Sequence, residues 1–493
     1  MENKIKVLFV AAELNPIAKV GGLADVIGAL PKAIKKLGVD VRIVIPKYGI
    51  VDEKKYPLKK VAEQIIVHFN HQNENISLYE TPLPDTDVPV YLFDNLKYLG
   101  DNGVYYEKDA SPGGSLRENQ RFTFYVKSSL EFFEHINWWP DIIHFHDWHV
   151  GILAVLLKLK ARKDERYKSI KTLLTIHNMA YQGKYNPQDV FNNLELTEND
   201  YPTLKLRTGE NQDINYLQQA ILSADLINTV SSTYAYEILT PEFGEGLEDT
   251  LKSRKSDLFG VLNGIDIERF NPQKDKDIIA NYTAQNLDGK KKCKIDLQKI
   301  CGLKINEKIP VLGIVSRLTD QKGIDLLHEI LPNLMATDLQ LIILGTGNAI
   351  FEQLVSNDTK KYSSRMFSKI AFDAKLAQKI YAGSDIFLLP SKFEPCGLVQ
   401  MIAMRYGTIP VVRSTGGLKD TVQSYNSQTE EGDGFIFQNY QANEFLAGIQ
   451  KALSLYQDKK KWYKLVMKDM QKDFSWEVSA KKYLGLYYKI LNI

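Results

Sequence analysis

The sequence predicts an α/β protein built from two doubly wound parallel-sheet domains. Short apolar runs alternate with longer amphipathic stretches along the chain, which is typical of βαβ units. The alternation stops at a polar, lysine-rich segment, residues 266–301, and then restarts. The length of 493 residues also exceeds what a single hydrophobic core usually holds. We therefore expect two domains that meet near residue 265.

The chain begins with a predicted strand followed by a glycine-rich turn. The apolar run IKVLFVAAE, residues 5–13, ends in a charged residue, and apolar residues recur at helical spacing in the next stretch, IAKVGGLADVIGALP. Lys19, Gly21 and Gly22 therefore lie at the start of a helix. Helix N-terminal amides favour anions, and a lysine adds a full positive charge. A phosphate is the expected ligand of this turn.

Further strands are predicted in both halves of the chain. In doubly wound sheets ligands bind beyond the carboxyl ends of the strands, so the cleft between the two halves is the expected site. The predicted strands are residues 41–46, 88–93, 141–146, 171–178, 226–231 and 261–266 in the first half, and residues 310–316, 339–345, 385–391 and 409–414 in the second.

Composition and charge are those of an ordinary soluble enzyme. Hydrophobic residues make up 44% of the chain and charged residues 25%. The formal net charge of +2 gives no reason to expect nucleic acid or an anionic membrane as a partner. No apolar run approaches the ~20 residues that a membrane span needs. The three cysteines fit reduced thiols better than a disulfide framework, so a cytoplasmic location is expected.

A nucleotide-dependent dehydrogenase is one alternative, because a glycine-rich turn follows the first strand. The fingerprint G-x-G-x-x-G is absent from that turn, and the later LGTGN, residues 344–348, has a single G-x-G. The acidic residue that should end the second strand is also missing, since Asp40 precedes that strand. The sequence therefore disfavours a dehydrogenase.

A metal centre is a second alternative. The motif HFHDWH brings His144, His146, Asp147 and His149 together, and the first two would share one face of a strand. No further ligand stands at a known spacing, and the D-x-D at residues 85–87 lies between prolines, as in a loop. Structural histidines and a solvated turn are the favoured interpretation, and no metal site is predicted.

Cations and glycine turns follow several predicted strands. Arg317 and Lys322 follow the predicted strand at residues 310–316. The motif PSKFEPCGL, at the end of the predicted strand at residues 385–391, supplies Glu394 and the N-terminal amides of a further helix. A third turn, STGGL, follows residues 409–414. Each motif alone is weak. Together with Lys19 they predict a clamp for a diphosphate at the carboxyl ends of the strands.

These motifs, in this order, identify a family resemblance that covers nearly the whole chain. The sequence resembles bacterial glycogen synthases and the catalytic part of plant starch synthases. The matching motifs are KVGGLADVIGALPKAIKKLGVDVRIVIP, HFHDWH, TIHNMAYQGKY, VLNGIDIERFNP, VSRLTDQKGIDLL, PSKFEPCGLVQMIAMRYGTIPVVRSTGGLKDTV and FSWEVSAKKYLGLYY.

The resemblance implies the GT-B architecture, two Rossmann-like domains facing across a cleft. It implies a retaining hexosyltransferase that moves glucose from ADP-glucose to the non-reducing end of glycogen or another α-1,4-glucan, without a metal or other cofactor. Residues 1–262 should form the acceptor-side domain and residues 267–474 the donor-side domain. Residues 475–493 should form a helix that crosses back to the first domain. The location would be the cytoplasm, or a plastid for a processed plant-type enzyme.

The same resemblance assigns residues to the reaction. Glu394 matches a glutamate beside the donor sugar, Asp147 and His177 match residues that line the glucose pocket, and Phe372 falls beside the adenine. Glu394, His177, Asp147 and Lys19 are thus the expected catalytic residues. The expected donor-binding residues are Lys19, Gly21, Gly22, Arg317, Lys322, Phe372, Cys396, Gly397 and Leu398.

Some positions differ from the common family pattern, and two other functions stay open. Gln218, Ser232, Phe270 and Glu118 replace a frequent lysine, proline, tryptophan and aspartate, respectively. None of them belongs to the diphosphate clamp. The open alternatives are a related transferase that uses UDP-glucose or makes sucrose, and a catalytically silent glucan-binding protein.

Overall fold

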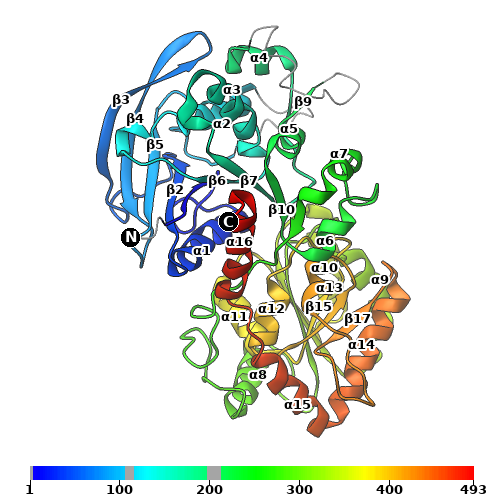
Figure 1. Cartoon of the computed structure of the whole chain (residues 1–493). Helices are drawn as coiled ribbons and strands as arrows, with labels where there is room; N and C mark the ends of the chain where they lie inside the picture. Colours follow the sequence, from blue (N-terminus) through cyan, green and yellow to red (C-terminus); the bar gives the residue numbers. More distant parts are fainter. Residues whose placement is uncertain (1–3, 106–115, 197–212) are drawn as a thin grey trace. The chain divides into compact units, whose positions relative to one another are not determined.

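The computed structural model describes residues 4–105, 116–196 and 213–493, and divides the chain into two compact units (Figure 1). The first unit, residues 1–230, 235–261 and 476–493, contains the start and the end of the chain. The second unit contains residues 231–234 and 262–475. None of the described helices is long and apolar enough to cross a bilayer.

The first unit is built on a nine-stranded sheet of order β11-β10-β7-β6-β1-β2-β5-β4-β3. The six strands from β11 to β2 and the β2–β5 pair are parallel, as predicted. The central strands are buried on both faces, in keeping with their nearly continuous apolar sequences. The strands are β1 (Lys6–Val10), β2 (Asp40–Pro46), β3 (Lys59–Phe69), β4 (Gln72–Pro82), β5 (Pro89–Asp94), β6 (Ile142–His146), β7 (Lys171–Ile176), β10 (Leu226–Thr229) and β11 (Leu258–Gly260).

Two features of this sheet differ from the prediction. β3 and β4 form an antiparallel hairpin at one edge, and β4 is also antiparallel to β5. These strands contain no continuous apolar run by which to predict them, because one face of each is polar and exposed. The strand predicted at 261–266 is wrong: β11 ends before it. Its apolar residues Val261 and Ile265 are buried in an irregular connection instead.

Helices flank this sheet, and the last helix of the chain packs with the first. α16 belongs to the first unit and contacts α1 and β7. A short ladder of β8 (Lys184–Tyr185) and β9 (Ile214–Asn215) lies apart from the main sheet. The helices are α1 (Gly22–Lys36), α2 (Leu116–Ser128), α3 (Leu153–Lys163), α4 (Pro187–Leu194), α5 (Tyr216–Ser223), α6 (Ser232–Glu237, whose first residues belong to the second unit), α7 (Glu248–Ser253) and α16 (Trp476–Leu491).

Two buried hydrogen bonds fix α16 to the sheet. The Tyr487 hydroxyl lies 2.9 Å from Nδ1 of His144 on β6, and Asn228 on β10 donates to the Tyr483 hydroxyl over 2.9 Å. Both tyrosine side chains are fully buried. The other ring nitrogen of His144 meets the Thr175 hydroxyl at 2.8 Å. His144 is therefore a structural residue that links three elements.

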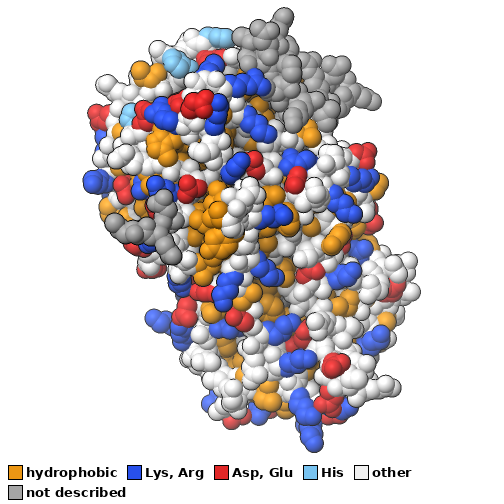
Figure 2. Space-filling view, in the orientation of Figure 1, with side chains coloured by type: hydrophobic (Ala, Val, Ile, Leu, Met, Phe, Trp, Pro, Cys, Tyr) orange, Lys and Arg blue, Asp and Glu red, His pale blue; other side chains and the backbone are white. Residues whose placement is uncertain are grey.

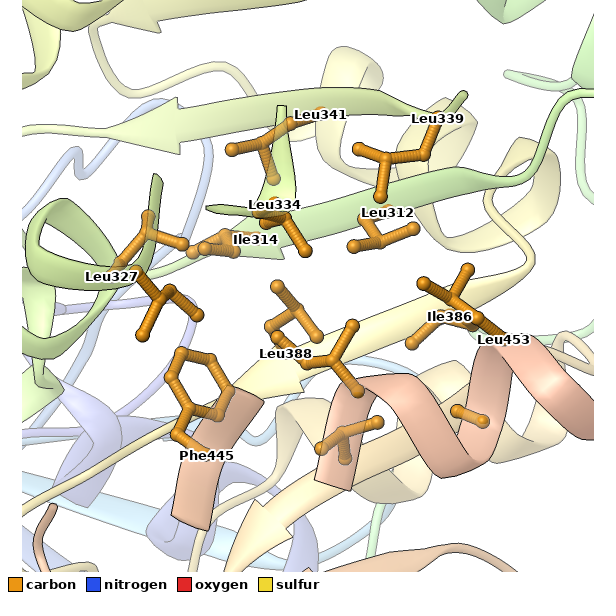
Figure 3. Packing of buried hydrophobic residues seen from close by; sticks show 14 of the residues in the cluster. Leu312, Ile314, Leu327, Leu334, Leu339, Leu341, Ile386, Leu388, Phe445 and Leu453 are labelled. Carbon is orange, nitrogen blue, oxygen red and sulfur yellow. The ribbon is translucent and has the colours of Figure 1, made fainter. Parts of the chain in front are cut away.

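The second unit has a six-stranded, all-parallel sheet of order β14-β13-β12-β15-β16-β17. Leucine and isoleucine side chains of its strands interdigitate with those of α9 and α14 in one buried cluster (Figure 3). The strands are β12 (Val311–Val315), β13 (Gln340–Gly345), β14 (Met366–Ile370), β15 (Ile386–Leu389), β16 (Ile409–Arg413) and β17 (Phe435–Phe437). The helices are α8 (Asp288–Ile300), α9 (Ile324–Leu334), α10 (Ala349–Lys361), α11 (Ala374–Gly383), α12 (Val399–Arg405), α13 (Gly416–Thr421), α14 (Ala442–Gln457) and α15 (Lys459–Met470).

In each of the two large sheets the winding of the chain reverses at the first strand. In the first unit β1 lies between β2 and β6, so the chain leaves β1 to one side and later returns to its other side. In the second unit β12 lies in the same way between β13 and β15. The loops at such a point diverge and leave a crevice at the carboxyl ends of the two strands. Ligand-binding crevices are therefore expected after β1 and β6 in the first unit, and after β12 and β15 in the second.

We expect Tyr487→Phe to destabilise the first unit by about 1–2 kcal/mol, because it leaves Nδ1 of the buried His144 without its partner. Urea unfolding and hydrogen exchange of the β6 amides measure this effect. Tyr488→Phe is the matched control, since Tyr488 is 44% exposed. Equal unfolding midpoints for the two variants would show that the hydrogen bond adds nothing to stability.

Candidate active site

The glycine-rich turn after β1 has its own internal partners. The Lys19 ammonium lies 2.6 Å from the carboxylate of Asp25, in the first turn of α1, and the side chains of both residues are about one-third exposed. The ammonium is thus accessible, and its charge is balanced by a carboxylate of the same unit. An incoming anion must compete with Asp25 for it.

A buried glutamate, Glu13, organises this turn. One of its carboxylate oxygens accepts hydrogen bonds from the backbone amides of Val20 and Gly21, at 2.7 and 2.6 Å. Its other oxygen accepts from the Tyr105 hydroxyl. Both amides are therefore already occupied, including that of Gly21, which was a predicted donor-binding residue. Neither Glu13 nor Tyr105 is among the predicted site residues; the signal for Glu13 is a lone charge directly after an apolar strand.

The two glycines of the turn differ in the space around them. A Cβ on Gly21 would lie 3.4 Å from Glu13, which is ordinary contact. A Cβ on Gly22 would meet no protein atom within 4 Å. The fold therefore does not require glycine at position 22, whereas a ligand that approaches the backbone closely would.

Asp147, directly after β6, has a backbone conformation unusual for a non-glycine residue, with φ 60° and ψ −177°. Such conformations cost about 1–3 kcal/mol and concentrate at functional sites. The Asp147 carboxylate accepts a 2.7 Å hydrogen bond from the backbone amide of His177, which follows β7. Burial, aided by the nearby Glu13 carboxylate, raises the pKa of Asp147 to about 7. The structure thus brings Asp147 and His177 together.

The rings of His144, His146 and His177 lie next to one another beside this point, whereas His149 packs against Trp148 and Phe122. Nδ1 of His146 lies 3.1 Å from Nε2 of His177, and burial lowers the pKa of His177 and of His149 to about 3. His144 and His146 share a face of β6, as predicted, with ring centroids 4.3 Å apart. Within the described ranges, no three potential ligand residues are grouped as a metal ion would need. Burial therefore keeps the side chains of His144, His146, His149 and His177 neutral at neutral pH.

The second unit places an ion pair at its own reversal point. Lys322, just after β12, has its ammonium 2.5 Å from the carboxylate of Glu394, in the loop after β15. The Ser391 hydroxyl donates to the same carboxylate oxygen over 3.0 Å. Both charged side chains are nearly buried, at 15% and 9% exposure. The pair therefore holds two neighbouring loops together at the carboxyl edge of the sheet.

The loop that carries Glu394 is packed against the glycine turn of α13. The Gly417 amide donates to the Glu394 carbonyl over 3.1 Å. A Cβ on Gly416 would lie 2.0 Å from that carbonyl oxygen, and one on Gly417 would lie 1.9 Å from the Cys396 carbonyl oxygen. Gly397 adopts a positive φ of 69°. The STGGL turn therefore acts through packing: it positions the loop with Glu394.

The other predicted donor-binding residues lie in the same unit. Arg317 is exposed, and its guanidinium donates to the Gln321 side chain over 3.2 Å. Cys396 is buried, which raises the pKa of its thiol to about 12, so the thiol is neutral. Leu398 precedes α12. Phe372, in the loop after β14, is 90% exposed, as suits a ring that would cover a flat ligand.

Family models match both parts of the chain. A model described as "Starch synthase catalytic domain" matches residues 6–253, and "Glycosyl transferases group 1" matches residues 299–467. A glycogen synthase of Thermotoga petrophila is 43% identical over 493 residues, covering 99% of each chain. The chain belongs to the glycogen and starch synthase family. A glycogen synthase of Clostridium perfringens is likewise 43% identical, over 489 residues.

Solved structures agree with this assignment. The catalytic domain of starch synthase IV from Arabidopsis thaliana, bound to ADP and acarbose, matches with a TM-score of 0.89 and 32% identity over the full length of both chains. Sucrose-phosphate synthase from Thermosynechococcus elongatus shares the fold, with a TM-score of 0.60 and 16% identity over 99% of this chain. The predicted family, GT-B fold class and glucosyltransferase activity class are confirmed.

The raised pKa of Asp147 predicts a pH-dependent stability difference from Asp147→Asn. The folded state holds the Asp147 proton more tightly than the unfolded chain does, so this group's stabilising contribution is full below pH 3.8 and lost as the pH rises through about 7. We expect the asparagine variant to have the higher Tm at pH 8 and to lose that advantage by pH 4. Calorimetric melting at several pH values measures the difference; a difference that is constant with pH would contradict the raised pKa.

Proposed function

We propose that this protein transfers glucose from ADP-glucose to the non-reducing end of an α-1,4-glucan such as glycogen, with retention of the anomeric configuration. The observation that carries the proposal is the buried Lys322–Glu394 pair at the β12/β15 reversal point, in a chain of the glycogen and starch synthase family. Residues 1–262 would serve the acceptor, and residues 267–474 the donor. We expect the reaction to take place in the cytoplasm.

The diphosphate of the donor would be held mainly by the second unit. Arg317 is exposed and Lys322 nearly buried, and both follow β12. Backbone amides at Gly397 and Leu398 would cap the phosphates at the start of α12, and Phe372 would cover the adenine. Lys19, with the open backbone at Gly22, would approach the same diphosphate from the first unit.

These cations meet the charge that develops as the reaction proceeds. Breaking the bond between the glucosyl C1 and the diphosphate oxygen leaves negative charge on the departing oxygens. Preorganised ammonium, guanidinium and amide groups stabilise such charge without reorganising during the step. Lys322, Arg317 and Lys19 can supply this stabilisation, so the proposal requires no resident metal cofactor.

Retention is explained by attack from the face that the leaving group vacates. After C1–O cleavage an oxocarbenium-like glucosyl is held briefly, and the acceptor 4-hydroxyl attacks the same face. Its proton passes to the departing phosphate oxygen. Glu394, fixed by Lys322 and Ser391, would orient or stabilise the sugar, and His177 and Asp147 would line its pocket. A covalent glucosyl-enzyme trapped on Glu394 or Asp147 would refute this mechanism.

The first experiment measures incorporation of labelled glucose into glycogen from ADP-glucose and from UDP-glucose, with and without a chelator. We expect incorporation from ADP-glucose, no effect of the chelator, and loss of activity in Glu394→Gln. Preference for UDP-glucose would keep the reaction and overturn the donor. No incorporation from either donor would favour the silent glucan-binding alternative.

Lys322→Met should lower kcat for transfer by about 10²–10³, because it removes one donor of the charge-stabilising set. It also leaves the Glu394 carboxylate without its cation. Lys392→Met is the matched control: Lys392 is exposed and pairs only loosely with Asp320, at 3.4 Å. Steady-state kinetics with ADP-glucose compare the two. A similar kcat for both variants would remove Lys322 from the proposed clamp.

Gly22→Ala should fold normally but bind the donor less tightly, since the added methyl group meets open space where the diphosphate would approach. Gly485→Ala, in α16, also meets no atom within 4 Å and serves as the control. We expect unchanged melting for Gly22→Ala and a KM for ADP-glucose raised about tenfold or more, a loss of at least ~1.4 kcal/mol. An unchanged KM would show that the diphosphate does not approach this turn.

A further inference from the structure

The second unit contains a cavity at the edge of its sheet opposite to Glu394. The cavity has a volume of about 150 Å³ and lies where β15 begins, between α8, α11 and the start of α15. Asp385, the residue before β15, lines it, whereas Glu394 follows the end of the same strand. The cavity is therefore distinct from the site described above, and the function proposed there does not depend on it.

Positive charge predominates in the lining. Five lysines face two carboxylates, in a protein whose overall net charge is only +2. Elsewhere, basic and acidic side chains are interspersed, as on the face in Figure 2. A local excess of ammonium groups around a concave space favours a multiply charged anion. The lysines are Lys290, Lys291, Lys294, Lys308 and Lys459, and the carboxylates are Glu307 and Asp385.

Two of the lysines are committed to the fold. Lys290 is buried and donates to three backbone carbonyl oxygens and the Thr408 hydroxyl, at 2.9–3.1 Å. Lys294 pairs with Asp385 at 2.7 Å and donates to the Tyr456 hydroxyl, also at 2.7 Å. The Asp385 carboxylate accepts in addition from the Val311 amide at the start of β12. These hydrogen bonds hold Lys290, Lys294 and Asp385 in place without a ligand, and the Lys294 ammonium balances the charge of the Asp385 carboxylate.

Lys459 differs from these, because its ammonium lies over an aromatic ring. The nitrogen is 2.9 Å from the ring centroid of Tyr456, and Lys459 opens α15, where the helix dipole adds positive potential. Burial lowers the pKa of Lys459 to about 8. An anion in the cavity would stabilise the charged ammonium, whose position the existing contacts already fix.

Aromatic rings also line the cavity. Tyr456 and Trp462 meet edge to face with centroids 5.1 Å apart, and Tyr463 is 39% exposed at the rim. Lys291 and Lys308 are exposed at the same opening. A ligand with a phosphoryl group and a compact ring would thus meet ammonium groups and neighbouring aromatic side chains in the same small space.

We propose that this cavity is a binding site for a small phosphate monoester, with the phosphoryl group on Lys459 and Lys308 and the ring against Trp462 and Tyr463. The space excludes a large ligand, since it holds only a few water volumes. Inorganic phosphate and ring-bearing phosphate esters share the phosphoryl chemistry, and the aromatic wall favours the ester.

The test is calorimetric titration of the full-length protein with phenyl phosphate, inorganic phosphate and phenol. We expect phenyl phosphate to bind more tightly than either of the other two. Lys459→Gln and Lys308→Gln should each weaken binding about tenfold. Lys460→Gln, the next residue on α15, is the matched control, and Arg317→Gln reports any binding at the donor site.

Unchanged binding in Lys460→Gln and Arg317→Gln, with loss in Lys459→Gln, would establish the site. No binding of phenyl phosphate to the native protein, or equal binding by Lys459→Gln, would overturn it. Loss in Arg317→Gln alone would assign the binding to the donor site and also overturn it. Equal affinity for inorganic phosphate would refute the ring contact and with it the proposed ligand class. Glucose transfer is measured separately, so failure here is distinct from failure of the proposed function.

Discussion

The constraint on which the rest of the structure depends is the reversal of winding at β1 and at β12. Because crossovers between parallel strands have one hand, the connections that leave the two neighbouring strands at such a point run to opposite faces of the sheet, and the loops diverge. The candidate site residues lie at these two points. Glu13 and the Lys19 turn follow β1, and the Lys322 and Glu394 loops follow β12 and β15. Topology thus determines where charged groups can be partly buried and still reach a ligand.

Each of these cations has a carboxylate partner within its own unit. Lys19 pairs with Asp25, and Lys322 with Glu394. An unpaired charge at the burial of Lys322 would be costly, and Glu394 balances it internally. Under the proposed function, an incoming diphosphate would have to share or displace a carboxylate at both lysines. Affinity for the donor would then be a difference between two interactions, which favours reversible binding.

Much of the fold and part of the site could be predicted from the sequence. Continuous apolar runs located most of the buried parallel strands, though not β11, β14 or β17. Charged residues after the predicted strands indicated Lys322 and Glu394 at one edge of the sheet. The β3–β4 hairpin was missed because its strands are apolar on one face only. Tyr105 was missed because its contact with Glu13 joins residues 92 positions apart. Glu13 was missed because its bonds to two backbone amides depend on the conformation of the turn. The packing role of Gly416 and Gly417 depends likewise on where a neighbouring loop lies, which spacing along the chain does not encode.

The return of α16 to the first unit has a consequence for biosynthesis. Tyr483 and Tyr487 complete hydrogen bonds to Asn228 and His144, yet the second unit, apart from residues 231–234, is translated between Val261 and Trp476. At roughly 5–20 residues per second, the ribosome needs on the order of 10–40 s to cover that interval. During this time α16 is missing from the first unit, so the surface of β6, β7 and β10 that it contacts is uncovered. The second unit, in contrast, is contiguous in sequence apart from residues 231–234. The first unit, whose synthesis begins first, is therefore completed last, when α16 packs onto its sheet.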